Sequence, residues 1–210
     1  MNATLLFDVD GTLIDSYPGI RQGFLIGLEA VRWDKPSEEF IRRIPGPPMP
    51  ETMHSLGMDD EQVETAMRAY SDYMSGEGWQ RFEVYPGMAA LVEQLAGEGY
   101  RVCTATSKSE RFARAALERA GLLEHIDFLG AASNDGKRAK KVDVIRYVLD
   151  TAKPERPLMI GDRLHDFEGA KEFGIPSVAA TWGYGAAEEW DLADYVARDA
   201  AELERIIREF

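Results

Sequence analysis

Short apolar runs alternate with amphipathic stretches over most of the chain. Apolar runs of strand length lie at 5–7, 100–106, 125–130, 157–161 and 177–181. Between and after them, apolar residues recur every three or four positions over 88–96, 109–120, 142–149, 166–173 and 200–210. That spacing is typical of helices that bury one face. Strands that alternate with helices predict an α/β fold built on a doubly wound parallel sheet.

One stretch after the first strand carries only the helical pattern. Its apolar residues follow helical spacing, as at Ile20, Phe24 and Leu28, and it has no strand-like run of β-branched residues. The proline-rich segment 45–50 divides it with a non-helical turn. The sequence thus predicts two domains: an α/β core of residues 1–17 and 84–210, and an inserted helical domain of residues 18–83.

The first predicted strand ends in two aspartates, Asp8 and Asp10, followed by Gly11. Glycine permits a tight turn at this point. In open α/β sheets, ligands bind at the carboxyl ends of the strands. Of two carboxylates placed there, one can attack phosphorus or hold a metal while the other moves a proton.

Three more groups of polar residues follow later strands. Thr106 ends the second strand, and its hydroxyl can donate a hydrogen bond to a phosphoryl oxygen. The basic run 137–141 precedes a helix, and either Lys140 or Lys141 could neutralise charge on a transferring phosphoryl group. Asp162 and Asp166 follow the fourth strand and supply the oxygen ligands that Mg²⁺ prefers. Lys108 is expected to be a solvated loop residue.

The stretch Asp8-Val9-Asp10-Gly11-Thr12 resembles the first motif of the haloacid dehalogenase (HAD) superfamily, and the later residues follow in that superfamily's order. The resemblance implies a Rossmann-like core and a Mg²⁺-dependent phosphatase that works through an aspartyl-phosphate. It implies that Asp8 is the nucleophile and Asp10 the general acid/base. Thr106 and a lysine, with Lys141 preferred to Lys140, would hold the transferring phosphoryl group.

The resemblance also implies a Mg²⁺ site. Its protein ligands would be Asp8, Asp162 and the backbone carbonyl of Asp10, with Asp166 acting through water or by orienting its neighbours.

The inserted helices resemble the C1-type cap of the phosphoglycolate phosphatase-like subfamily. The segments 44–49 and 181–185 resemble a cap loop and a late core loop of that subfamily. Tyr70-Ser71 departs from the Tyr-Arg that relatives often carry, so the cap's contact to an anionic substrate end is open. The expected substrate is a small phosphorylated metabolite such as phosphoglycolate, a nucleotide or a sugar phosphate.

Two alternatives share the same aspartates: a phosphosugar mutase, and a non-enzymatic receiver-like module that uses aspartyl-phosphate as a signal. Thr12 favours a phosphatase over a mutase, and the inserted domain disfavours a receiver. A dehalogenase would not need a second acid at Asp10.

Charge and composition limit the binding partners and the cellular location that we expect. The net charge is -13, from 37 acidic and 24 basic residues, so a nucleic acid would be repelled. No apolar run approaches the ~20 residues that span a bilayer, and no signal peptide is recognisable. The single cysteine, Cys103, cannot form an internal disulfide, which fits a reducing compartment. We expect a cytoplasmic protein without membrane partners, as a monomer or a weak homodimer.

Overall fold

The computed structural model describes residues 2–210. Contacts divide the chain into two compact units. One unit contains the residues up to Asp15 together with Glu83–Phe210, and the other is Ser16–Phe82. Within the described residues, no helix is both long and apolar enough to span a membrane.

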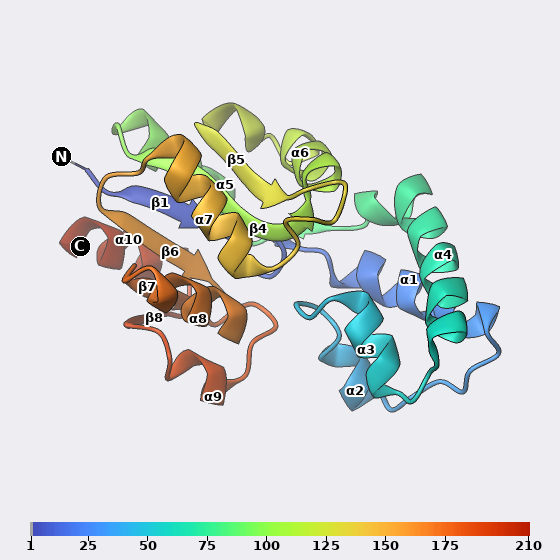
Figure 1. Cartoon of the computed structure of the whole chain (residues 1–210). Helices are drawn as coiled ribbons and strands as arrows, with labels where there is room; N and C mark the ends of the chain where they lie inside the picture. Colours follow the sequence, from blue (N-terminus) through green and yellow to red (C-terminus); the bar gives the residue numbers. More distant parts are fainter. Residues whose placement is uncertain (1) are drawn as a thin grey trace. The chain divides into compact units, whose positions relative to one another are not determined.

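The first unit is built on a parallel sheet (Figure 1). Its strands are β1 (Thr4–Phe7), β4 (Arg101–Ser109), β5 (Phe128–Ala132), β6 (Pro157–Gly161), β7 (Ser177–Ala180) and β8 (Tyr195–Ala197). Their order is β5-β4-β1-β6-β7-β8, so the first strand lies in the middle of the sheet. Phe7 is in register with Thr104 on one side and Ile160 on the other. The predicted doubly wound α/β fold is confirmed.

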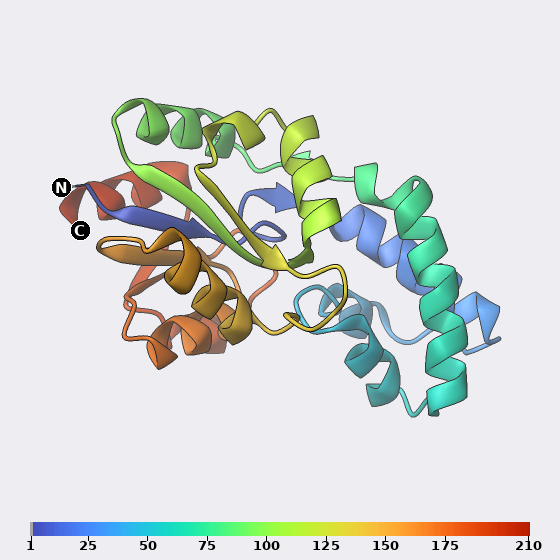
Figure 2. The same ribbon diagram turned by 45° about the horizontal axis from the view of Figure 1, so that its top comes forward.

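Helices cover both faces of this sheet (Figures 1 and 2). They are α5 (Met88–Gly97), α6 (Glu110–Arg119), α7 (Lys141–Ala152), α8 (Leu164–Glu172) and α10 (Ala200–Glu209). The short helix α9 (Ala187–Trp190) lies in the connection between β7 and β8. Helices α7 and α8 pack against each other on one face, and α5 contacts α10 on the other. Leu6 of β1, Met159 of β6 and Val144 of α7 are fully buried members of one apolar cluster. This packing removes apolar surface from water and fixes the strand ends in place.

Several elements differ from the sequence predictions. His125, predicted to begin a strand, lies in a short 3-10 turn (Leu123–His125), and β5 begins only at Phe128. Strand β8 and helix α9 were not predicted, because three or four residues are too few to show a period. A small antiparallel pair, β2 (Ile14–Asp15) with β3 (Glu83–Val84), was also too short to predict.

The second unit is helical. Its elements are α1 (Tyr17–Ala30), α2 (Glu38–Arg42), α3 (Met49–Ser55), α4 (Asp60–Gly76) and the 3-10 turn η1 (Gly78–Gln80). It has an apolar cluster of its own that includes Phe24, Ile41 and Met53, all fully buried. The proline-rich turn is shorter than predicted, because Pro50 lies in the first turn of α3, where proline costs no hydrogen bond.

Candidate active site

Asp8 directly follows β1, and its carboxylate is the centre of the site. The backbone holds it on both sides: Asp8 N–H donates to the Ile160 carbonyl at 2.8 Å, and Val9 N–H donates to Asp8 Oδ1 at 2.8 Å. Burial raises the pKa of Asp8 to about 6; Lys141 opposes this shift and Asp166 adds to it. A nearby cation therefore favours the charged form of the Asp8 carboxylate against the effect of burial.

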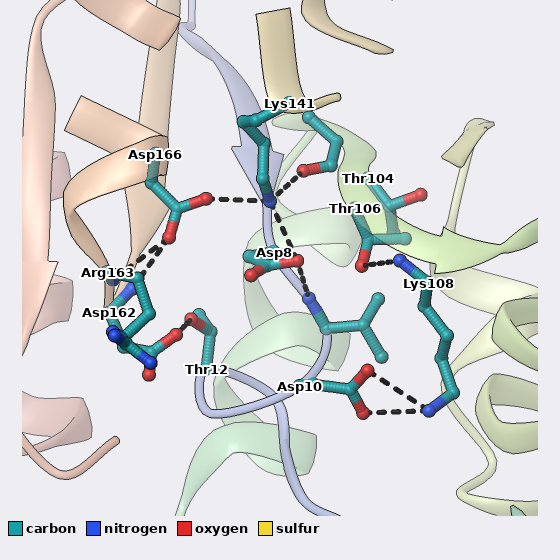
Figure 3. A network of polar contacts seen from close by, with 12 residues as sticks. Asp8, Asp10, Thr12, Thr104, Thr106, Lys108, Lys141, Asp162, Arg163 and Asp166 are labelled. Carbon is teal, nitrogen blue, oxygen red and sulfur yellow. Dashed lines mark hydrogen bonds and ion pairs between the residues drawn. The ribbon is translucent and has the colours of Figure 1, made fainter. Parts of the chain in front are cut away.

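Lys141 supplies one such cation. Its Nζ lies 3.0 Å from Asp8 Oδ1 and 2.6 Å from Asp166 Oδ1, and it donates to the Ala105 carbonyl at 2.7 Å (Figure 3). An ammonium has three protons, and three acceptors surround this one. Burial disfavours the charged form, but Asp166 and Asp8 outweigh it and raise the lysine pKa. Lys140, the alternative in the basic run, is exposed.

Replacing Lys141 by methionine is expected to destabilise the metal-free protein by about 3 kcal/mol, because it leaves buried carboxylates without their cation. Urea unfolding in the presence of a chelator would measure the loss. Lys140→Met, one residue away on the surface, should change the free energy of unfolding by less than about 0.5 kcal/mol. Equal effects of the two substitutions would contradict the assignment of Lys141 as the buried counter-ion.

The carboxylate of Asp8 belongs to a cluster of three buried carboxylates. Asp8, Asp162 and Asp166 each offer an oxygen, and these oxygens lie within 4.8 Å of one another. Asp166 Oδ2 accepts from the backbone N–H groups of Asp162 and Arg163, both at 3.1 Å. Burial, with the charges of Asp166 and Asp8, raises the pKa of Asp162 well above its usual range.

The charges in this cluster fit a divalent cation. Lys141 offsets one of the three negative charges, while the side chain of Arg163 is paired with Glu189 at 3.0 Å. Uncompensated charge is costly in a buried site, and three carboxylate oxygens match the ligand preference of Mg²⁺. A cation held by Asp8, Asp162 and Asp166 would neutralise charge on phosphoryl oxygens. The backbone carbonyl of Asp10 stays a predicted further ligand.

Thr106 and Asp10 lie on the other side of Asp8 (Figure 3). The Thr106 side chain is close enough to the Asp8 carboxylate to lower its pKa. The Asp10 carboxylate is directed to Lys108, whose Nζ lies 2.8 Å from Oδ1. The expectation that Lys108 is a solvated loop lysine is wrong. Strand β4 continues to Ser109, and the Lys108 side chain is only 9% exposed.

The sequence matches the family model of haloacid dehalogenase-like hydrolases over residues 5–180. The chain belongs to the haloacid dehalogenase-like hydrolase family. This confirms the superfamily resemblance drawn from the motif that begins at Asp8.

Relatives of this hydrolase carry different names. It is 39% identical to tyrosine-protein kinase PtkA of Mycobacterium tuberculosis, over 96% of this chain and 70% of that protein. It is 32% identical to a 5'-nucleotidase of Pseudomonas aeruginosa, over 88% of this chain and 85% of that protein. A crystal structure of a predicted phosphatase from Clostridium acetobutylicum superposes with a TM-score of 0.93 and 32% identity, covering 100% of both chains.

A loop after β7 completes the site of the hydrolase. Tyr184 N–H donates to Asp162 Oδ2 at 2.7 Å, and Trp182 Nε1 donates to the Thr12 carbonyl at 3.0 Å. Between them, a Cβ on Gly183 would overlap Asp162 and the carbonyl of Gly11. The loop therefore fixes both Asp162 and the turn that follows Asp10. The sequence indicated it only through resemblance, although two glycines around Tyr184 were a signal of close backbone packing.

Proposed function

We propose that this hydrolase is a Mg²⁺-dependent phosphatase of small phosphomonoesters, with Asp8 as its nucleophile. The observation that carries the proposal is the environment of Asp8. Its carboxylate pairs with the buried Lys141, lies near the Thr106 side chain, and belongs with Asp162 and Asp166 to a cluster of carboxylates that could hold a cation. Positive charge and hydrogen-bond donors around an attacking oxygen stabilise the negative phosphoryl oxygens in the transition state.

In the first step, an oxygen of Asp8 attacks phosphorus in line with the leaving oxygen. The bond from phosphorus to the leaving oxygen breaks, and Asp10 donates the proton that this oxygen takes up. The products are the alcohol and an aspartyl-phosphate on Asp8. Lys141 and the Thr106 hydroxyl lie at the nucleophile, where they can contact the transferring phosphoryl group.

In the second step, water attacks the phosphorus of the aspartyl-phosphate and gives a proton to Asp10. The bond from phosphorus to the Asp8 oxygen breaks, which releases phosphate and restores the Asp8 carboxylate. Asp10 is then protonated and ready for the next cycle. A carboxylate that alternates between acid and base in this way needs a fixed orientation toward both reacting oxygens.

The helical unit Ser16–Phe82 is proposed to act as the cap that selects the substrate. Support comes from its composition of helices around a separate apolar cluster and from the resemblance of its loop 44–49 to a cap loop. A cap can exclude water and contact the non-reacting end of the substrate.

A second candidate is transfer of the phosphoryl group to a tyrosine hydroxyl instead of water. The 39% identity to a protein named a tyrosine-protein kinase favours it. Such a transfer would use the same cluster around Asp8 and differ in the group that finally accepts phosphorus. The two functions therefore differ in product, which makes them separable by experiment.

The test is a panel of small phosphomonoesters and pyrophosphate, assayed for phosphate release with Mg²⁺ and with a chelator. We expect metal-dependent release that favours one compound. In parallel, ATP and a tyrosine-containing protein are incubated with the hydrolase and probed for phosphotyrosine. Phosphotyrosine without phosphate release would favour the kinase-like function. Sugar-phosphate interconversion without release would favour a mutase, and a long-lived phosphorylated form would favour a receiver-like module.

A further inference from the structure

Lys108 holds the carboxylate of Asp10 at both of its oxygens. Lys108 Nζ lies 2.8 Å from Oδ1 and 3.1 Å from Oδ2 (Figure 3). The lysine side chain is 9% exposed and that of Asp10 is 22% exposed, so water competes little for the ammonium group of Lys108. Rotation of the Asp10 carboxylate about χ2 would break one of the two contacts with Lys108. The ion pair therefore fixes the plane of the carboxylate as well as its position.

The backbone of β4 places Lys108 where it can make this contact. The strand continues three residues beyond Thr106, and its register with β5 shifts between Thr106 and Ser109. Such irregularities redirect side chains, and they are frequent next to active sites. Lys108 N–H donates to the Thr106 hydroxyl oxygen at 3.2 Å, which ties the two residues together. The lysine is thus fixed at its backbone and at its ammonium.

We infer that Lys108 is a positioning residue that aims the Asp10 carboxylate at the oxygens with which it exchanges protons. The inference rests on the proposed function, because it requires Asp10 to act as the acid/base. A cation in this place could instead bind the substrate. Its contact with both oxygens of Asp10 favours positioning, because two of its three protons are already engaged.

The two chemical steps depend on Asp10 to different degrees, and this gives the inference a kinetic signature. The leaving group of p-nitrophenyl phosphate departs without a proton. Transfer of the phosphoryl group from this substrate to Asp8 therefore does not need Asp10. Hydrolysis of the aspartyl-phosphate does need it. For Lys108→Met, we expect kcat/KM for p-nitrophenyl phosphate to stay within about threefold of wild type while kcat falls about 30-fold. A burst of about one p-nitrophenol per active site should precede the slow turnover.

An alkyl phosphomonoester has a poor leaving group and needs Asp10 in both steps. With the best alkyl substrate of the panel, Lys108→Met should therefore lower both kcat and kcat/KM by about 30-fold. Lys137→Met is the matched control. Lys137 belongs to the nearby basic run, pairs with Asp135 and is 87% exposed, so its loss should leave all parameters unchanged.

A double-mutant cycle shows whether Lys108 acts through Asp10. In an Asp10→Asn background, Lys108→Met should change p-nitrophenyl phosphate kinetics by less than about twofold, because the carboxylate that it orients is already gone. If Lys108→Met does not fold, Lys108→Gln, which keeps one donor group, takes its place in the same cycle.

Two results would overturn the inference alone: an equal rise in KM for both substrates with kcat unchanged, or a full additional loss in the Asp10→Asn background. Either would make Lys108 a substrate ligand. A wild-type hydrolase that turns over no phosphomonoester would overturn the proposed function and this inference together.

Discussion

Replacing Asp8 by asparagine is expected to lower phosphomonoester turnover by at least about 10⁴-fold, because the amide cannot attack phosphorus. The fold should survive. The side-chain oxygen of asparagine can still accept from Val9 N–H and contact Lys141, as Asp8 does at 2.8 Å and 3.0 Å. The loss would then come from the missing nucleophile and not from a changed site.

Phosphate release measures this loss, and acid quenching with a ³²P-labelled substrate tests for the aspartyl-phosphate. Wild type should give labelled protein, and Asp8→Asn should give none. Asp150→Asn, on the exposed side of α7, removes the same charge and should leave turnover unchanged. If Asp8→Asn kept turnover within about tenfold of wild type, the assignment of Asp8 as the nucleophile would be contradicted.

Asp162→Asn is expected to lower turnover by at least about 100-fold and, at the same time, to stabilise the metal-free protein. The activity falls because the cation site loses a ligand, and metal ions contribute several kcal/mol to transition-state charge stabilisation. The stability rises because Asp162 is fully buried and repelled by Asp166 and Asp8, which raise its pKa. An amide in its place removes one of three like charges and can still accept from Tyr184 N–H.

Thermal unfolding with a chelator and with Mg²⁺ separates the two effects. In chelator, the midpoint of Asp162→Asn should exceed that of wild type by several degrees, which corresponds to roughly 1–3 kcal/mol. Added Mg²⁺ should raise the wild-type midpoint by mass action and leave that of the variant nearly unchanged. Asp150→Asn should follow wild type in both solutions. A variant that is less stable than wild type in chelator would show that Asp162 is not a site of charge repulsion.

The main elements of the core could be predicted because buried parallel strands and amphipathic helices leave clear patterns. The runs at 5–7 and 157–161 are apolar on both faces, which places them inside a covered sheet. Asp8 and Asp162 directly follow those runs, so the topology alone brings them to one edge of the sheet.

Side-chain direction was harder to predict. Lys108 lies in a polar stretch that looks like a loop, yet the register shift in β4 turns its ammonium toward Asp10. Lys140 and Lys141 have the same chemistry, and only the start of α7 decides which one is buried. Such differences depend on where an element begins or ends to within one residue, and these boundaries are the part of an element that a sequence pattern predicts least well.

The central position of β1 in the sheet has a consequence for folding during synthesis on the ribosome. Of the strands in this sheet, β1 is translated first, and its two neighbours begin only at Arg101 and Pro157. The helices of Ser16–Phe82 make their own apolar cluster from residues translated before either neighbour. Because β1 needs partners that are distant in the sequence, it stays unpaired until those partners have been translated. The strand that precedes Asp8 is thus translated well before either of the strands that cover its edges.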